Sequence, residues 1–130
     1  MTKEEHIKYW IDIAEKDWAI HLKLYDSMDF VYCLFFVHLM VEKLSKAVWV
    51  KYNVDNYPPK SHNTCYILDQ AKIGLSDEQK DFLLILNEFN IEGRYPDYNQ
   101  KIFKICTKKY TDDILLKTKE IKEWLLSRLQ

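Results

Sequence analysis

Three polar side chains recur at four-residue spacing in an otherwise apolar segment of the chain. His38, Glu42 and Lys46 lie within residues 29–51, where most other side chains are hydrophobic. Residues four apart project from the same face of a helix, so this spacing predicts one polar row on a helix that is otherwise buried. Such a row could line a binding site for an anionic group, or it could seal an interface between subunits.

Neither metal binding nor nucleophilic catalysis is indicated by these residues. His38 and Glu42 stand one helical turn apart, but di-metal bundles use Glu-x-x-His pairs together with carboxylates from several helices. No histidine of this chain has a carboxylate three residues before it. The two glycines are too few for a phosphate-binding glycine loop, and no serine stands in a glycine-rich turn. We therefore predict neither a metal ion nor a cofactor.

Arg94 is a second candidate for anion binding. It lies at the end of a predicted helix and is followed by Tyr95, in a segment rich in polar and aromatic side chains. A guanidinium group can bind a phosphate or a carboxylate through two parallel hydrogen bonds. The alternative is structural, because arginines also form ion pairs that fix loops. The carboxylates considered for that role are Glu42, Glu88 and Glu92.

The composition predicts a single domain spanning residues 1–130. The chain is 48% hydrophobic and 15% aromatic, which is ample for a packed core. Its formal net charge of −1 provides no general attraction to nucleic acid. A local basic cluster before the last helix is more often a solvated face than a phosphate-binding track; it consists of Lys101, Lys104, Lys108 and Lys109.

Three features predict a cytoplasmic protein that is not bound to a membrane. The three cysteines include no Cys-x-x-Cys pair and are typical of small buried residues in a reducing compartment. The charged N-terminus does not open an apolar signal sequence. The longest apolar run, residues 30–37, is far shorter than a membrane span.

Helical spacing of the apolar residues predicts an all-α fold, an up-and-down bundle of four long helices and one short helix. Three of the long helices are expected over residues 3–26, 29–52 and 76–92. The fourth long helix follows at the C-terminal end of the chain and is expected to be capped by Thr111. Ser61 or Asn63 is expected to cap the short helix, which ends near residue 72. Residues 98–110 fit either a short helical turn or an extended loop.

Local signals define the boundaries of these helices. Gly74 is expected to end the short helix in the left-handed conformation. Ser76 and Gln79 form a capping-box signature for the next helix. The side chains of that helix expected to face the core are Phe82, Leu83, Ile85, Leu86 and Phe89.

Four segments in this order resemble the motifs of the HEPN domain family of helical-bundle proteins. Residues 14–18 resemble the alanine and aspartate pattern of its first helix. Residues 36–47 resemble its second-helix signature, in which an aromatic-histidine step leads into Glu-Lys-x-x-Lys-Ala. Residues 61–63 resemble the histidine that begins its short helix, and residues 93–97 resemble its Arg-Tyr-Pro element. Together the four segments span nearly the whole chain.

The resemblance implies properties that composition and spacing do not. Members typically form homodimers through their long helices, and many accompany a small nucleotidyltransferase, often as a toxin–antitoxin pair. Other members are metal-independent ribonucleases, in which an arginine is followed by four to six residues and a histidine. Here that histidine would fall at Asn99, Gln100 or Lys101, none of which can act as histidine does near neutral pH. The usual ribonuclease pair is therefore missing.

We accordingly predict a binding and dimerisation module rather than an enzyme. It would bind a nucleotide, an RNA segment or a partner nucleotidyltransferase through a polar groove. In this groove the carboxylates of Asp17 and Glu42 would hold Arg94 and Lys46 in place. The predicted groove residues are Asp17, His38, Glu42, Lys46, Arg94 and Tyr95.

Two alternatives remain from the sequence. The first is a metal-independent RNA endonuclease with an altered site, using Arg94 and either His62 or His38. Each histidine also has a structural interpretation: His62 as a hydrogen-bonding residue at a helix start, and His38 as a buried residue satisfied by Glu42 or a backbone carbonyl. The second alternative is a purely structural homodimer whose polar row seals the subunit interface.

Overall fold

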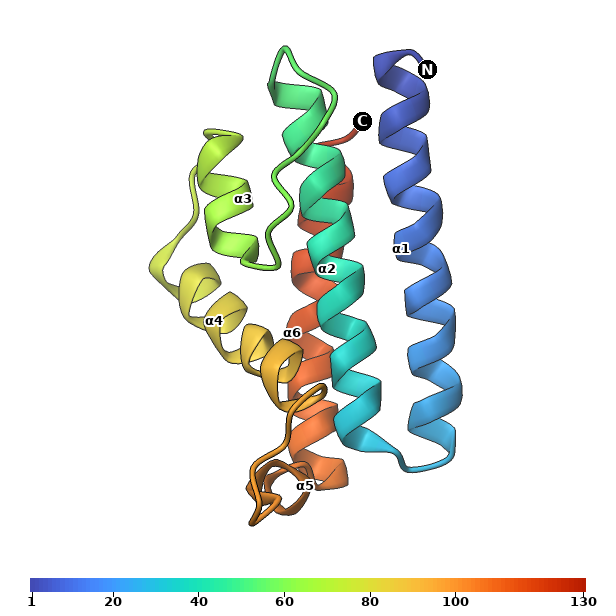
Figure 1. Ribbon diagram of the computed structural model, residues 1–130, viewed down its shortest axis with the longest axis vertical. Coiled ribbons are helices and arrows are strands. Elements are labelled where there is room, and N and C mark those ends of the chain that lie inside the picture. The colour runs from blue at the N-terminus through green and yellow to red at the C-terminus, as the bar shows by residue number, and fades with distance from the viewer.

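The computed structural model describes all residues, 1–130, which form six helices and no strand (Figure 1). The predicted all-α fold with four long helices is confirmed, and the segment that the sequence left open contributes a second short helix. None of the six helices combines the length and the hydrophobicity that a membrane span requires. In chain order the helices are α1 (Lys3–Asp26), α2 (Phe30–Tyr52), α3 (Thr64–Gln70), α4 (Asp77–Glu92), α5 (Lys101–Ile105) and α6 (Lys108–Ser127).

α2 is the central helix of the bundle and packs against each of the other five helices. In Figure 1, α1 and α6 run alongside α2, whereas α4 crosses at an angle. Because α2 is apolar on nearly every side, it is stable only when other elements cover it all round. Its fully buried side chains include Val37, Met40, Val41 and Leu44. The polar row on α2 is consequently buried as well.

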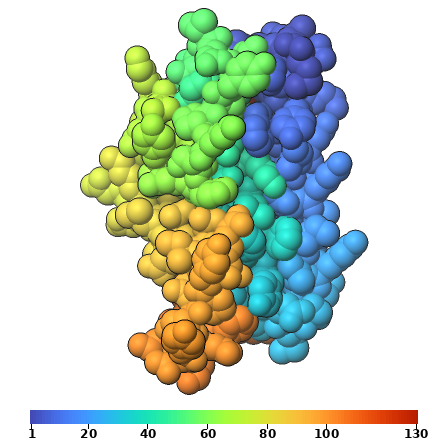
Figure 2. Space-filling view, in the orientation of Figure 1, coloured from blue at the N-terminus to red at the C-terminus, as the bar shows by residue number.

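Two lysines attach the C-terminal end of α2 to other parts of the chain. The ammonium group of Lys3 donates to the carbonyl oxygens of Val50 and Asn53 and to Oδ1 of Asn56, each at 2.8 Å. Lys51 reaches the carbonyl of Arg128 at 2.7 Å. A positive charge at this end also complements the helix dipole. Residues 53–63 then run back along α2 and cover part of it (Figures 1 and 2).

Two predicted boundaries are wrong. The short helix ends at Gln70, so the left-handed residue is Lys72 (φ 59°), and Gly74 has no positive φ. Thr107, not Thr111, caps α6 and accepts a hydrogen bond from the backbone N–H of Tyr110. Thr111 lies one turn inside the helix, where its buried hydroxyl donates to the Thr107 carbonyl.

The remaining predictions for α4 are mostly confirmed. Ser76 and Gln79 form the predicted capping box, and the side chains of four of the five expected core residues are buried. The exception is Ile85, which is 38% exposed because it lies beside a cavity between α4 and α6 rather than against α2.

Candidate functional site

Glu42 is the centre of a buried polar network on α2. One carboxylate oxygen, Oε1, lies 2.9 Å from Nδ1 of His62 and 3.5 Å from Nε2 of His38. The other, Oε2, lies 3.4 Å from the ammonium group of Lys46. Only 4% of the Glu42 side chain is exposed, so its charge is compensated by these three neighbours rather than by solvent. The spacing of His38, Glu42 and Lys46 thus brings all three together, as one helical face requires.

The same neighbours keep Glu42 ionised. Burial alone would raise the pKa of its carboxyl group, because a charge is poorly solvated inside the protein. The interactions with His38, His62 and Lys46 favour the charged form more strongly and lower the pKa from 4.5 to about 2. Glu42 is therefore an anion at neutral pH and can hold a cationic or hydrogen-bonding side chain in a fixed position.

His38 is completely buried, as expected, but the expected hydrogen bond to Glu42 or to a backbone carbonyl is not formed, because neither ring nitrogen has a partner. Its Nε2 is 3.5 Å from Glu42, too far for a good hydrogen bond, and its Nδ1 has no partner. A side chain without exposed surface cannot contact a ligand directly. His38 can therefore influence a ligand only through its neighbour Glu42.

His62 is the network residue that reaches the surface, with 54% of its side chain exposed. It lies directly before α3, but the residue that caps this helix is Asn63, whose side chain accepts a hydrogen bond from Tyr66 N–H. Asn63 is one of the two predicted caps of this helix, and the hydrogen bond of His62 at the helix start is made with Glu42. Because Glu42 binds Nδ1, the other ring nitrogen, Nε2, remains available to a ligand.

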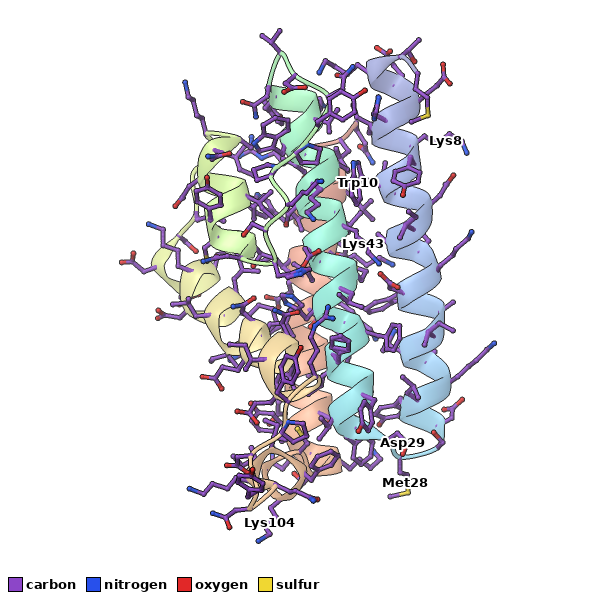
Figure 3. All side chains as sticks on the ribbon, in the orientation of Figure 1. Lys8, Trp10, Met28, Asp29, Lys43 and Lys104 are labelled. Atoms are coloured by element: carbon purple, nitrogen blue, oxygen red, sulfur yellow. The ribbon has the colours of Figure 1, made fainter.

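Lys46 and Asp17 are fixed by Trp10 and Lys43, two residues that the sequence did not point to. The ammonium group of Lys46 lies 5.3 Å from the centre of the Trp10 ring, and Asp17 forms a 2.6 Å ion pair with Lys43. Both contacts join α1, which carries Trp10, to α2, which carries Lys43 (Figure 3). Trp10 and Asp17 are seven residues apart, two turns on one face of α1, and this spacing could have identified the pair.

Arg94 does not join this network. Its guanidinium lies 5.1 Å from the centre of the Phe35 ring, and its Nε is 3.4 Å from Oδ1 of Asn90. No carboxylate lies within 4.0 Å of it, so neither Asp17 nor Glu42 holds it in place, and the proposed pairing with Glu42, Glu88 or Glu92 is wrong. The side chain is exposed and keeps most of its donors free.

The end of α4 is brought close to α2 by Gly93. A Cβ atom at this position would lie 2.7 Å from the Phe89 carbonyl oxygen and 3.0 Å from the Phe35 ring, so only glycine fits without displacement. Phe35 and Glu42 are seven residues apart on the same face of α2, which corresponds to about 10 Å along the helix axis. Arg94, next to Phe35, and His62, next to Glu42, therefore lie at two different positions along the same face of α2.

The segment after Arg94 is exposed. Tyr95 is 78% exposed, and Gln100 adopts a left-handed conformation (φ 53°) just before α5. The three positions at which the family motif would place a histidine all face solvent; they are Asn99, Gln100 and Lys101. No group of three or more His, Cys, Asp or Glu side chains is arranged to hold a metal ion.

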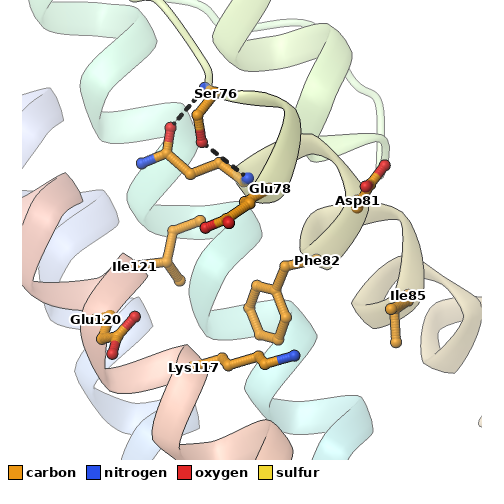
Figure 4. Close-up of a pocket in the computed structure, with 9 residues that line it drawn as sticks. Ser76, Glu78, Asp81, Phe82, Ile85, Lys117, Glu120 and Ile121 are labelled. Atoms are coloured by element: carbon orange, nitrogen blue, oxygen red, sulfur yellow. Dashed lines mark hydrogen bonds between the residues drawn. The ribbon is translucent and has the colours of Figure 1, made fainter.

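A separate cavity of about 580 Å³ lies between α4 and α6 (Figure 4). It contains none of the predicted site residues. Phe82 and Ile121 belong to its apolar lining, and Glu78, Asp81 and Glu120 supply carboxylates.

Comparison with known proteins identifies the family. No curated protein and no solved structure is significantly similar to the chain. The family model of the HEPN domain, in contrast, matches residues 7–129. This match covers nearly the whole helical bundle, including the Glu42 network and Arg94. The chain therefore belongs to the HEPN domain family.

Proposed function

We propose that this domain binds single-stranded RNA through phosphate groups, at Arg94 and His62, and does not cleave it. The observation that carries this proposal is the position of Glu42, a buried anion that binds Nδ1 of His62, whose side chain is 54% exposed and whose Nε2 has no hydrogen-bond partner in the chain. Arg94 supplies a second donor group that no carboxylate of the chain neutralises. A guanidinium and an imidazole are both suited to phosphate oxygens.

The arrangement favours a chain of nucleotides over a single phosphate. Arg94 lies next to Phe35 of α2, and His62 lies next to Glu42. These two positions are about 10 Å apart along the helix axis, so one phosphate cannot bridge both. The exposed ring of Tyr95, adjacent to Arg94, offers a surface on which an unpaired base can stack.

The test compares the two arginines of the chain. Replacing Arg94→Gln should weaken binding of a fluorescently labelled single-stranded oligoribonucleotide about tenfold in an anisotropy titration. It should also reduce the salt dependence by about one phosphate contact. Arg128→Gln is the matched control, since Arg128 also lies over an aromatic ring, that of Trp124, but at the end of α6. Equal affinities of the two variants would refute the proposal.

His62 is tested in the same titration. His62→Gln should weaken binding, whereas His6→Gln, a change to a histidine that packs against Tyr57 instead, should not. If both histidine variants bind like the unmodified protein, the Glu42–His62 pair has a structural role only.

One observation favours metal-independent RNA cleavage as a second candidate. A carboxylate bound to one ring nitrogen, with the other nitrogen exposed, is the arrangement by which a histidine is oriented as a general base. Since His38 has no exposed surface, His62 is the histidine of this candidate. It predicts RNA cleavage by the purified protein in a chelator, lost in both Arg94→Ala and His62→Ala. Intact RNA after incubation with the unmodified protein would exclude it.

The family resemblance adds predictions about partners, namely a homodimer and a small nucleotidyltransferase. If the polar row sealed a subunit interface, Glu42→Ala would convert a dimer into a monomer in sedimentation. The row is covered by His62 and Trp10 of the same chain, which favours a role inside the subunit. A dimer that persists in Glu42→Ala would support this view.

A further inference from the structure

A small apolar hollow lies between α5 and the beginning of α2. Its volume is about 110 Å³, and nearly all of its lining residues are hydrophobic. Phe30 and Val31 are buried lining residues, whereas Tyr32 and Phe103 are 43% and 39% exposed. The rings of Tyr32 and Phe103 meet edge-on, with their centres 6.0 Å apart. The hollow therefore presents two accessible aromatic rings above a buried apolar base.

The hollow lies next to Arg94 along α2. The guanidinium of Arg94 rests on the ring of Phe35, and Tyr32 precedes Phe35 by three residues, which is about 4.5 Å along the helix axis. Met28 and Asp29 also line the hollow and lie at the end of the molecule where α2 begins (Figure 3). A nucleotide that follows a phosphate held by Arg94 can therefore place its base in the hollow.

The size of the hollow fits one six-membered ring. An apolar cavity of about 150 Å³ can hold a benzene molecule, so an open hollow of about 110 Å³ can take the ring of one pyrimidine. The two fused rings of a purine need more room. Unpaired bases also stack on aromatic side chains, which Tyr32 and Phe103 supply. Shape and lining thus favour a single pyrimidine base.

Asp29 gives the hollow a hydrogen-bond acceptor. It is the N-cap residue of α2, but its side chain does not cap the helix; its Oδ2 instead accepts a 2.6 Å hydrogen bond from the Ser27 hydroxyl. Its Oδ1 has no partner in the chain, and the backbone N–H groups of the first turn of α2 receive no capping bond.

This arrangement distinguishes the two pyrimidines of RNA. A carboxylate oxygen beside backbone N–H groups complements a base edge that has a donor next to an acceptor. Cytosine has such an edge, because its amino group stands beside a ring nitrogen that accepts. Uracil has a carbonyl oxygen in place of the amino group, and this oxygen would face the carboxylate of Asp29.

We propose that the hollow binds one unpaired cytosine of the strand held at Arg94. The ring of the base lies against Tyr32 and Phe103, and its amino group donates to Oδ1 of Asp29. This inference rests on the proposed RNA binding and adds a base preference to it. Phosphate contacts carry no sequence information, so Arg94 and His62 by themselves bind every sequence alike.

The base preference can be measured with labelled oligoribonucleotides of equal length that contain only cytidine, uridine or adenosine. In an anisotropy titration, the cytidine strand should bind about tenfold more tightly than the uridine strand, and the adenosine strand should bind most weakly. Asp29→Asn should reduce the preference for cytidine over uridine to about twofold or less, because an amide can accept from an amino group or donate to a carbonyl oxygen. Asp26→Asn removes the same charge at an exposed acid of α1 outside the hollow and should leave the preference unchanged.

The aromatic side of the hollow is tested at Tyr32. Tyr32→Leu keeps an apolar side chain but removes the ring, and it should weaken binding of the cytidine strand about tenfold. Tyr52→Leu is the matched control, since Tyr52 is 44% exposed, against 43% for Tyr32, and lies at the opposite end of the same helix. Phe103→Leu tests the second ring on a different helix, and urea unfolding of each variant checks that the fold is retained.

The outcomes separate this inference from the proposed function. Equal affinities for the three strands, with Arg94→Gln still binding more weakly, would overturn the cytosine site and leave RNA binding intact. A cytidine preference that persists in Asp29→Asn would also overturn it. If the unmodified protein binds none of the strands, the proposed function itself is refuted, and the cytosine site with it.

Discussion

The Glu42 network and the Arg94 segment carry similar side chains but differ in how far the chain itself satisfies them. Around Glu42, Lys46 and two histidines surround a buried carboxylate, and the same chain covers them. Around Arg94, the guanidinium rests on Phe35 and the neighbouring Tyr95 is exposed, without a carboxylate in reach. A buried charge therefore serves first to position its neighbours, whereas an exposed charge without a partner is free to bind a ligand.

The largest effect that would test this comparison is on stability. Glu42→Gln leaves Lys46 and the histidines without their anion, and we expect the free energy of unfolding in urea to fall by about 3–5 kcal/mol. Glu88→Gln, at an exposed carboxylate of α4, should change it by less than about 0.5 kcal/mol. A similar small loss in both variants would mean that the network contributes little to the fold.

The contribution of Glu42 to the unfolding free energy should also depend on pH. Glu42 has a folded-state pKa lowered from 4.5 to about 2, so its contribution is fully present above pH 4.5 and is lost as the pH falls towards 2. This change in the pKa of Glu42 corresponds to about 3 kcal/mol of unfolding free energy. The difference in unfolding free energy between the unmodified protein and Glu42→Gln should therefore shrink across this range. A difference that stays constant would show that another group is responsible.

The smallest effect is expected at Arg94. Because this side chain is exposed and has no ion pair, Arg94→Gln should change the unfolding free energy by less than about 0.5 kcal/mol, although it weakens RNA binding. Thermal unfolding of the two proteins side by side measures this. A loss of more than about 1 kcal/mol would place Arg94 with Glu42 among the residues that stabilise the fold.

The parts of the fold that were predictable depend on local chemistry. The capping box of Ser76 and the spacing of the apolar residues defined the start of α4 and the all-α fold. Thr107 and Thr111 stand one turn apart and either could cap α6. The acidic pair that favoured Thr111 belongs to the second turn, where it binds Lys108 and Lys109.

The candidate site was predictable only along one helix. His38, Glu42 and Lys46 meet because helical geometry requires it, and their spacing shows this directly. The contact between His62 and Glu42 depends on the path of residues 53–63, and the separation of Arg94 from Glu42 depends on where α4 crosses α2. Both are results of tertiary packing, which local patterns do not specify.

The attachment of residues 53–63 at both ends has a consequence for ligand affinity. Lys3 holds the beginning of this segment, and the Glu42–His62 contact holds its end. A segment restrained in this way has lost most of its conformational entropy when the protein folds, so little remains to be lost when a ligand reaches His62. Removing the first three residues would free the beginning of the segment, and a ligand would then have to order it on binding.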